Sequence, residues 1–491
     1  MIRRLFLALA LLSTPALLPA QGPAGLGADL SSWYAQTMRS APGRWGIVVA
    51  DNSGEVLWSV NPSEPMVPAS TVKLLTTGFA RTVVGSEARR ATRVVGSGQV
   101  NPATGQWDGS WALELNGDPT LERTDRGGPM LTELAQQLAA IGVRRLNGPL
   151  TVTSGAGEPR AAYPTAWESR HRGRIFAPPV GPVTLNENVI GFSIAPGARA
   201  GQRPIIISES PSGISNIVTV SATTVAGTRN TIRFSVKPNG HYVVTGQIGT
   251  RSGSRRYVGV PTDPRIILDA AWSHATRAAG IQWTHAPTLA SANVGDRRIL
   301  AEVASQPFDS IAHEVNTRSL NIGAELLLLW GGGPDRAAER LTQHVRTVTG
   351  IDAGVHLVDG SGLSGADRVS PLVFTTYLAR FPLTPAGRNF ALLLPTNGSG
   401  TLRRLATGLP GPGVVRAKTG TLANASTLVG YLGRADGTLL IALMYNGGNT
   451  GAARAAQWEL FRKLGANGVV LPTAISDDNL SLGSTPETPE R

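Results

Sequence analysis

The chain has 491 residues, 41% of them hydrophobic and 16% charged, and a chain of this length and balance can bury more than one core. It contains no cysteine, which excludes disulfide bonds, thiol catalysis and thiolate metal sites. The formal net charge of +12 comes mainly from scattered arginines, with no basic run and no alternation of basic and aromatic residues, so nucleic acid is not an expected partner. We expect instead an attraction to anionic envelope polymers or lipid surfaces, with at most peripheral membrane association.

Residues 1–20 have the layout of a signal peptide. Two arginines precede an apolar run from Leu5 to Leu12, and a proline-containing stretch ends at Ala20. The run is too short to span a bilayer as a mature helix. We therefore expect cleavage near Ala20, with Ala24 as the alternative, and a periplasmic or other extracytoplasmic location for the mature protein.

A β-hairpin is predicted next, and it leads into a helix that begins near Pro68. The apolar stretch Trp45–Ala50 indicates a buried strand, a turn follows, and Glu55–Val60 indicates the returning strand. Four apolar residues at helical spacing predict the buried face of the helix: Val72, Leu75, Phe79 and Val83.

Ser70 and Lys73 stand three positions apart at the start of this helix, so their side chains share one face. A neutral lysine amine can accept a hydroxyl proton, which makes Ser70 a candidate nucleophile and Lys73 its base. The same spacing also occurs where a helix cap is followed by a surface lysine. Composition favours the chemical interpretation, because only Lys73, Lys237, Lys418 and Lys463 are lysines among 45 basic residues, and arginine cannot be deprotonated.

From about residue 91 the pattern changes to short strands and turns, and we expect residues 91–290 to fold as a β-rich insertion. The segments on either side, 21–90 and 291–475, would together form one domain, and the polar residues 476–491 a disordered tail. The elements predicted within the insertion are strands at Ala91–Ser97 and Ser110–Leu115, a helix at Leu131–Ile141, a β-rich run at Ile217–Val260 and a helix from Asp263-Pro264 to Ala279.

Two helices, Phe308–Thr317 and Ile322–Trp330, follow the insertion and are joined by a short connection. This connection can present the hydroxyl of Ser319 and the amide of Asn321 from one tight turn. A Ser-x-Asn sequence alone is more often a helix cap, so it gains meaning only beside other motifs.

A strand at Val414–Thr421 contains Lys418-Thr419-Gly420-Thr421, where lysine again replaces the arginine that this chain prefers. Glycine in a strand allows another backbone to approach closely, and we expect substrate to approach at Gly420. The remaining predicted elements are a hairpin of Thr427–Leu432 with Thr438–Tyr445 and a closing helix at Ala452–Leu464.

Ser-x-x-Lys, Ser-x-Asn and Lys-Thr-Gly in this order are the motif set of serine β-lactamases and penicillin-binding proteins. The chain resembles the class C low-molecular-mass penicillin-binding proteins, the D-alanyl-D-alanine carboxypeptidase and endopeptidase family that includes DacB-type enzymes. The resemblance covers nearly the whole chain after the signal peptide and includes four further stretches: Gly117–Leu121, Leu185–Val189, Asp359–Ser364 and Lys418–Leu422. The segment His171–Phe176 departs from the family pattern, which has acidic residues and a tyrosine there.

This resemblance implies an α+β fold, placed broadly in the α/β class. It would be a transpeptidase-like domain with an antiparallel sheet flanked by helices, interrupted by the β-rich insertion. The implied reaction is hydrolysis of a D-alanyl bond in peptidoglycan stem peptides or crosslinks through an acyl-enzyme, with β-lactams as inhibitors and no cofactor. The carboxypeptidase and endopeptidase activities both fit the motifs.

The resemblance also implies a role for each candidate residue. Ser70 would be acylated, Lys73 would take its proton, and Ser319 would relay the proton to the leaving amine. Lys418 would keep its charge, bind the terminal carboxylate and lower the pKa of Lys73. The other expected contacts are a substrate amide at Asn321, carboxylate binding at Thr419 and Thr421 beside Gly420, and an oxyanion hole from the backbone N–H groups of Ser70 and Thr421.

Other sites and functions are less well supported by the sequence. His313-Glu314 lacks the second histidine of a zinc-binding H-E-x-x-H motif, so no metal site is expected. Asp359–Ser364 is interpreted as a structural turn that lines the site. Two alternative functions are a β-lactamase, which the long insertion disfavours, and an inactive wall-binding scaffold, which the intact Ser70 and Lys73 disfavour.

Overall fold

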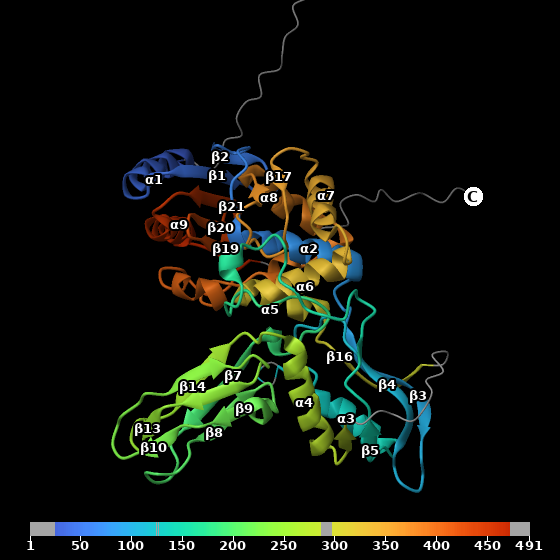
Figure 1. The fold of residues 1–491 in the computed structure, drawn as a ribbon. Coiled ribbons are helices and arrows are strands. Elements are labelled where there is room, and N and C mark those ends of the chain that lie inside the picture. Colours follow the sequence, from blue (N-terminus) through green and yellow to red (C-terminus); the bar gives the residue numbers. More distant parts are fainter. Residues whose placement is uncertain (1–24, 124, 126, 286–296, 472–491) are drawn as a thin grey trace, which may run out of the picture.

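The computed structural model describes residues 25–123, 125, 127–285 and 297–471. Figure 1 shows two parts. We call the upper part the body, which is formed by the described residues before β3 (Ala91–Val100) and after β16 (Arg298–Ala304), and the lower part the inserted part, which runs from β3 to β16. The body contains both the first and the last described segments of the chain. The predicted signal peptide and C-terminal tail lie outside the described residues.

The body is built on a five-stranded antiparallel sheet in the order β19-β20-β21-β1-β2. Its strands are β1 (Arg44–Ala50), β2 (Val56–Val60), β19 (Val415–Leu422), β20 (Ala425–Arg434) and β21 (Gly437–Asn446). The pairing of β1 with β21 joins the start of the chain to its end. β19 lies at the edge of the sheet, and the outer side of its first residues pairs with the segment 395–397, because Ala417 N–H donates to the Pro395 carbonyl and Asn397 N–H to the Val415 carbonyl.

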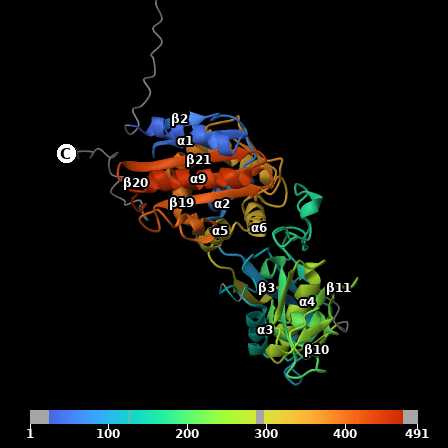
Figure 2. The same ribbon diagram turned by 90° about the vertical axis from the view of Figure 1, so that its left-hand side faces the viewer.

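Helices cover one face of this sheet from the two ends of the chain. These helices are α1 (Leu26–Ser40) and α9 (Thr450–Gly465), which lie together over the sheet in Figures 1 and 2. Ile47, Val49 and Phe461 belong to the core between them and the sheet, and each is fully buried.

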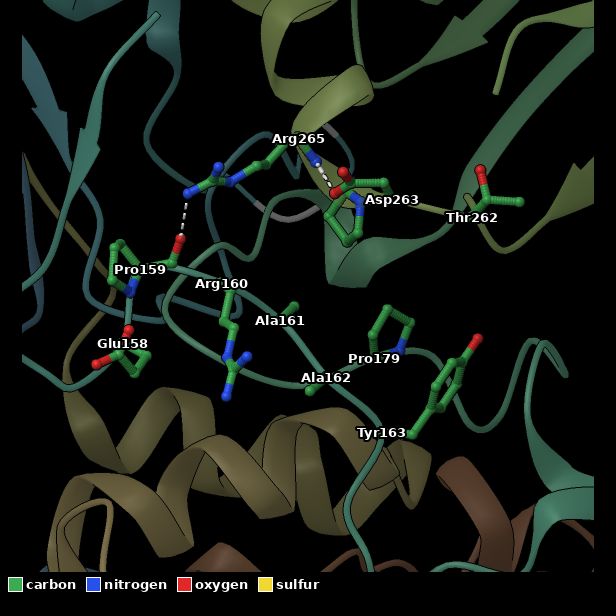
Figure 3. A pocket seen from close by; sticks show the side chains of 11 residues that line it. Glu158, Pro159, Arg160, Ala161, Ala162, Tyr163, Pro179, Thr262, Asp263 and Arg265 are labelled. Carbon is green, nitrogen blue, oxygen red and sulfur yellow. Dashed lines mark hydrogen bonds between the residues drawn. The ribbon is translucent and has the colours of Figure 1, made fainter. Parts of the chain in front are cut away.

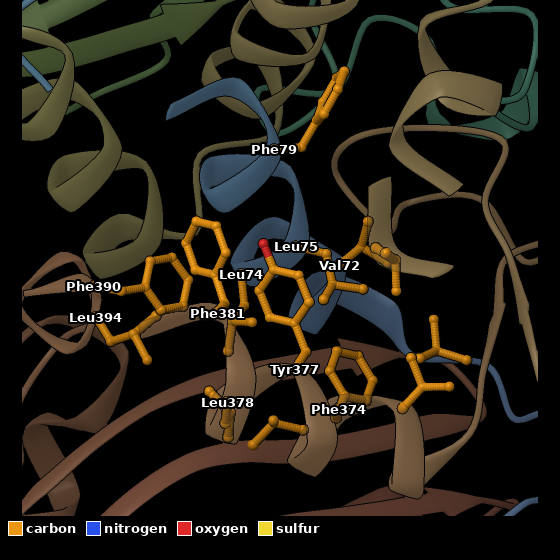
Figure 4. Packing of buried hydrophobic residues seen from close by; sticks show 14 of the residues in the cluster. Val72, Leu74, Leu75, Phe79, Phe374, Tyr377, Leu378, Phe381, Phe390 and Leu394 are labelled. Atoms are coloured by element: carbon orange, nitrogen blue, oxygen red, sulfur yellow. The ribbon is translucent and has the colours of Figure 1, made fainter. Parts of the chain in front are cut away.

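A larger helical layer covers the other face, where Val48 and Ala50 point. Its helices are α2 (Val72–Val84), α5 (Phe308–Arg318), α6 (Asn321–Gly332), α7 (Ala337–Thr349) and α8 (Pro371–Arg380), with the short hairpin β17 (Val355–His356) and β18 (Arg368–Val369) beside them. Figure 4 shows Leu74 and Leu75 of α2 packed among Tyr377, Phe381 and Phe390. None of the helices in the described ranges is both long enough and apolar enough to cross a bilayer.

The predicted buried face of α2 is confirmed for Val72, Leu75 and Phe79 and wrong for Val83. Val83 is 56% exposed, whereas Val84 packs against the core in the last turn of the helix. A four-residue step overshoots one turn of a helix with 3.6 residues per turn by about 40°, so two such steps carry Val83 about 80° away from Leu75 and off the buried side.

The inserted part contains several small sheets and two helices. Its main sheet has the order β16-β3-β4-β6, from β3 (Ala91–Val100), β4 (Trp107–Glu114), β6 (Val152–Thr153) and β16 (Arg298–Ala304). The other strands are β5 (Arg145–Asn147), β7 (Ile190–Ala195), β8 (Ile205–Ser210), β9 (Val218–Val220), β10 (Thr223–Val225), β11 (Arg233–Val236), β12 (Tyr242–Thr245), β13 (Gln247–Gly249), β14 (Arg255–Gly259) and β15 (Gln282–Thr284).

A core of its own holds the inserted part together. Its two helices, α3 (Leu131–Ala140) and α4 (Pro264–Ala278), pack on each other and contribute Leu134 and Trp272 to that core. The predicted N-cap of α4 is confirmed, because the Asp263 carboxylate accepts a hydrogen bond from the backbone N–H of Arg265 at 2.9 Å.

The chain leaves and re-enters the body along two segments that run side by side. The backbone N–H of Ser305 donates to the carbonyl of Arg90, and that of Phe308 donates to the carbonyl of Ala88. Strand β16 pairs with β3 and not with the body sheet. We therefore propose that the inserted part extends to Ala304, beyond the predicted boundary near residue 290. The antiparallel sheet flanked by helices, with a β-rich interruption, is confirmed.

Candidate active site

Ser70 lies in a tight turn that leads directly into α2. The 3-10 turn η1 (Ala69–Thr71) is fixed at its start, because the hydroxyls of Thr71 and Thr427 both donate to the carbonyl of Pro68, at 2.6 and 2.7 Å. Ala69 has φ 49°, a left-handed conformation that costs energy for any residue with a Cβ. Strained backbone of this kind concentrates at functional sites, and here it immediately precedes the candidate nucleophile.

Lys73 is completely buried and makes three hydrogen bonds. Its Nζ donates to Ser70 Oγ at 2.9 Å, to Asn321 Oδ1 at 2.6 Å and to the carbonyl of Ser361 at 2.5 Å. Three acceptors match the three hydrogens of an ammonium group. After losing one proton, the amine has a lone pair that can accept the hydroxyl proton of Ser70.

Burial lowers the pKa of Lys73 to about 7, because the charged form loses its hydration. The negative charges of Asp359, Glu325 and Asp367 act in the opposite direction. With this pKa, a substantial fraction of Lys73 is in the neutral amine form at neutral pH, whereas an ordinary lysine is almost entirely protonated.

Three buried carboxyl groups, those of Glu325, Asp359 and Asp367, lie near Lys73. Glu325 of α6 accepts hydrogen bonds from the backbone N–H groups of Gly360 and Ser361, and burial raises its pKa to about 8. Burial and the neighbouring Asp359 raise the pKa of Asp367 well above its usual range. Raised pKa values keep some of these groups protonated at neutral pH, so less negative charge reaches Lys73.

The segment Asp359–Ser364 is the turn that these groups hold in place. The Asp359 carboxylate accepts from the backbone N–H groups of Gly362 and Ser364 at 2.6 and 2.8 Å. The carbonyl of Ser361 accepts from Lys73, so the turn contacts the base directly. Gly362 has φ +72°, and a Cβ there would lie 1.9 Å from the carbonyl oxygen of Ala69. The turn therefore sets the position of both the base and the nucleophile.

Ser319 and Lys418 form a second hydroxyl–amine pair next to the first. Lys418 Nζ donates to Ser319 Oγ at 2.9 Å and to the carbonyl of Thr419 at 2.8 Å. Ser319 has φ 58° and ends α5, so its side chain leaves the helix and turns towards β19. This second pair therefore joins the end of α5 to the edge strand β19.

Lys418 is also buried, with no exposed surface. Burial together with the charge of Lys73 lowers the pKa of Lys418 well below the usual range. Burial is likewise the largest cause of the lowered pKa of Lys73. A buried cation is stabilised by a counter-charge, so the positive charge predicted for Lys418 stays a prediction that a bound carboxylate would favour.

Gly420 packs closely against the nucleophile turn, and the approach of substrate at this residue stays a prediction. A Cβ at Gly420 would lie 2.1 Å from Thr427 Oγ1 and 2.7 Å from the carbonyl of Pro68. Glycine is needed because β19 passes directly against the nucleophile turn. Thr419 and Thr421 alternate with it along the strand, and the Thr421 hydroxyl accepts a hydrogen bond from Arg454 Nη2 at 2.9 Å.

Asn321 connects the site to a segment of the inserted part. Its Oδ1 accepts from Lys73, and its Nδ2 donates to the carbonyl of Phe176 at 2.8 Å. Phe176 belongs to the divergent stretch noted in the sequence, which approaches the site from the side of α6. Trp167, which precedes this stretch, is buried in one hydrophobic cluster with Ile322 and Leu326 of α6.

The sequence analysis missed Glu325 and Phe176 as parts of this site, and it placed Ser361 only within a turn that lines the site. Glu325 stands within an otherwise apolar helix, and an acidic residue at such a position was the available signal. The contacts of Ser361 and Phe176 are made by backbone carbonyls, which carry no side-chain signature. Among the five main candidates, hydrogen bonds join Ser70, Lys73 and Asn321 in one group and Ser319 and Lys418 in another. The two groups are neighbours in the chain, because Ser319 and Asn321 stand two residues apart.

A separate cavity lies away from these residues. It has a volume of about 570 Å³ and is bounded by Glu158–Tyr163, by Pro179 and by the start of α4. Figure 3 shows Asp263 and Arg265 on one side of it and Tyr163 on the other. None of the five main candidate residues lines it, so volume alone does not identify the reactive centre.

Comparison with known proteins agrees with this geometry. The family described as D-Ala-D-Ala carboxypeptidase 3 (S13) matches residues 27–463. A D-alanyl-D-alanine carboxypeptidase of an Actinomadura species is 26% identical over 446 residues, which cover 84% of this chain and 79% of that protein. A carboxypeptidase of Mycobacterium tuberculosis is 30% identical over 414 residues, with 79% and 72% covered. The crystal structure of penicillin-binding protein 4 (dacB) from Haemophilus influenzae has a similar fold, with a TM-score of 0.68 at 20% identity, covering 88% of this chain and 98% of that one.

Proposed function

The chain belongs to the D-Ala-D-Ala carboxypeptidase 3 (S13) family, and from this we propose that it hydrolyses the bond after D-alanine in peptidoglycan stem peptides through an acyl-enzyme on Ser70. The observation that carries the proposal is the 2.9 Å hydrogen bond between Ser70 Oγ and the buried Lys73, whose pKa burial lowers to about 7. A serine next to a lysine amine of this kind has the arrangement of a nucleophile and its general base.

Acylation begins when Lys73 Nζ accepts the Ser70 proton as Oγ attacks the D-alanine carbonyl. The backbone N–H groups of Ser70 and Thr421 would stabilise the oxyanion, and such donors are each worth roughly 3 to 4 kcal/mol in other enzymes. Ser319 would deliver a proton to the leaving amine, and the bond between D-alanine and the leaving group then breaks. Water subsequently attacks the ester, with Lys73 again taking a proton, and Ser70 is regenerated.

Lys418 has a role that changes when substrate binds. A terminal carboxylate at Thr419 and Thr421 would place a negative charge beside Lys418 and raise the pKa that burial has lowered. The restored positive charge on Lys418 would in turn favour the neutral, reactive form of Lys73. Substrate binding would therefore help to prepare the base.

The same proposal includes an extracytoplasmic site of action, with residues 1–20 as the targeting signal. The support is the arginine and leucine pattern of these residues together with a substrate that lies in the cell wall. Penicillins, which carry a carboxylate next to a reactive amide, would acylate Ser70 in place of the peptide.

The test is intact-mass analysis after incubation with a penicillin, for the native protein and for Ser70→Ala, together with hydrolysis of a diacyl-L-Lys-D-Ala-D-Ala peptide. We expect one acyl group on the native protein, none on Ser70→Ala, and release of D-alanine by the native protein alone. An adduct that survives in Ser70→Ala would exclude Ser70 as the nucleophile. Rapid turnover of penicillin without turnover of peptide would instead identify a β-lactamase.

A further inference from the structure

A second cavity opens beside the edge strand of the active site. It has a volume of about 490 Å³ and lies between α9, β19 and the 3-10 helix η9 (Gly400–Leu405). Its wall includes Arg403 and Arg404 from η9, Arg454 and Trp458 from α9, and Thr419 and Thr421 from β19. We call this cavity the arginine cleft.

The arginine cleft has positive charge without internal compensation. Among the described residues, no salt bridge joins Arg403, Arg404 or Arg454 to a carboxylate, whereas many other arginines in the described part are paired. Arg454 instead donates to the neutral hydroxyl of Thr421. The buried hydroxyl of Thr401, on the same wall, has no hydrogen-bond partner within the described ranges. Guanidinium groups gathered without counter-charges favour an anionic ligand.

The wall formed by η9 is fixed relative to the catalytic residues. Gly400 has φ +45°, and a Cβ there would lie 2.3 Å from the carbonyl oxygen of Thr317, which is two residues before Ser319. On the opposite wall, Arg454 and Trp458 are four positions apart on α9 and so share one face. The cleft is therefore held by the same elements that hold Ser319 and Lys418.

The position of the cleft identifies the part of the substrate that would enter it. In the proposed reaction, Lys418 and Ser319 act on the leaving-group side of the bond, and Thr419 and Thr421 receive the carboxylate nearest to that bond. Both threonines also line the arginine cleft. The arginine cleft is therefore adjacent to the proposed binding position of the first carboxylate of the leaving group. A single D-alanine supplies only that one carboxylate, which leaves the arginines of η9 without a partner.

We propose that the arginine cleft binds the leaving group and selects leaving groups that carry a second carboxylate. The chemical class is an acidic peptide, such as the acceptor strand released when a peptide crosslink is cut. This inference rests on the proposed function and extends it, because it assigns the enzyme a preference for crosslinks over stem peptides that end in D-alanine.

The test compares two peptides that differ only in the charge of the leaving residue. The substrates are diacyl-L-Lys-D-Ala-D-Glu and diacyl-L-Lys-D-Ala-D-Gln, which have nearly the same shape. The leaving group has two carboxylates in the D-Glu peptide and one in the D-Gln peptide. We expect kcat/KM to be higher for D-Glu by about tenfold, the usual value of a charge-assisted hydrogen bond. In Arg403→Gln/Arg404→Gln the ratio should fall to near one, and in the native protein it should fall as salt is raised.

The matched control is Arg277→Gln, which removes a positive charge from an exposed position on α4 in the inserted part. It should keep the native ratio. A native ratio of one, a ratio that persists in the double variant, or an equal loss in Arg277→Gln would each overturn the proposal. If the double variant does not fold, the salt dependence of the native ratio still decides, since an uncharged cleft would show none. Penicillin acylation of the native protein separates this outcome from failure of the proposed function, which would remove the adduct as well.

Discussion

At the scale of single residues, the site depends on two lysines in a chain that otherwise uses arginine. Lys73 and Lys418 are both buried without exposed surface, and each has a serine hydroxyl within 2.9 Å. Lys237 and Lys463 lie at the surface of the described structure. Burial lowers the pKa of an amine and leaves a guanidinium charged, so the two residue types differ in chemistry at the buried positions and not at the surface.

Lys73→Arg should abolish acylation by penicillin while the protein remains folded. A guanidinium cannot take the Ser70 proton, and loss of general-base catalysis typically costs on the order of a hundredfold to ten-thousandfold in rate. The matched control is Lys463→Arg, the same change on the exposed side of α9, which should acylate at the native rate. Stopped-flow or quenched mass analysis measures both rates. Near-native acylation in Lys73→Arg would mean that the base lies elsewhere.

The acylation rate should rise with pH through about 7, because Lys73 must be neutral to act and burial lowers its pKa to that value. In Lys418→Ala the rising limb should move to higher pH. Two buried ammonium groups repel each other, so removing one makes protonation of the other easier and raises the pKa of Lys73.

Lys418→Arg keeps a positive charge, so its acylation rate should lie between those of the native protein and Lys418→Ala. The rising limb of its pH profile should lie closer to that of the native protein. The measurement is the second-order acylation rate from pH 5 to pH 9 for the three proteins. Equal rates and an unmoved profile in Lys418→Ala would show that this lysine has no electrostatic effect on the base.

At the scale of elements, the turn Asp359–Ser364 positions the nucleophile from outside its own helix. Gly362→Ala should reduce both stability and acylation. The new Cβ would meet the carbonyl of Ala69 at 1.9 Å, and a residue other than glycine is strained at φ +72°, together worth about 2 kcal/mol or more. Gly365→Ala, at the residue directly after the turn, is the matched control, because the nearest neighbour of a Cβ there is a side-chain oxygen of Glu168 at 3.7 Å.

Gly365→Ala should therefore remain close to the native protein in urea unfolding and in acylation rate. A Gly362→Ala protein with native stability and native acylation would show that the turn can move away from Ala69 without cost, and that it does not set the position of Ser70.

The elements of the body could largely be predicted from sequence, because their apolar periodicity and their glycine and proline boundaries are local signals. Ser70 with Lys73 was predictable for the same reason, since one helical turn fixes their separation. The contact of Asn321 with Phe176 was not, because it joins residues 145 positions apart through a backbone carbonyl. Strand β16 was missed because its short, partly exposed sequence acquires its role only by pairing with β3.

At the scale of the whole molecule, the inserted part is attached to the catalytic centre by more than the two crossing segments. Glu187 of the inserted part forms ion pairs with Arg318, the last residue of α5, and with Arg123. Arg318 also pairs with Glu314 at 2.7 Å. The Glu187 and Arg123 side chains are only 10% and 7% exposed. This network ends one residue before Ser319, so the inserted part contributes to the position of a proposed catalytic hydroxyl.

Glu187→Gln should lower the free energy of unfolding by about 3 kcal/mol, because removing the most buried carboxylate of this ion-pair network leaves Arg123 and Arg318 with fewer counter-charges. It should also slow acylation, since Arg318 precedes Ser319. Glu339→Gln is the matched control: its ion pair with Arg336 is exposed, with Glu339 63% accessible, and its loss should change neither quantity appreciably. Urea unfolding and acylation rates test both variants. A Glu187→Gln protein that unfolds and acylates like the control would separate the inserted part from the reaction.

The scarcity of lysine has a practical consequence for observing how the two parts move. Lys237 lies in the inserted part, between β11 and β12, and Lys463 lies on α9 in the body. With no cysteine to compete and with Lys73 and Lys418 enclosed, an amine-reactive dye would attach at these two positions and at the terminal amine. Labelling with a mixture of donor and acceptor dyes would place one of each on the inserted part and the body in a fraction of the molecules, without any substitution. Their energy transfer would report whether wall fragments change the separation of the two parts during turnover.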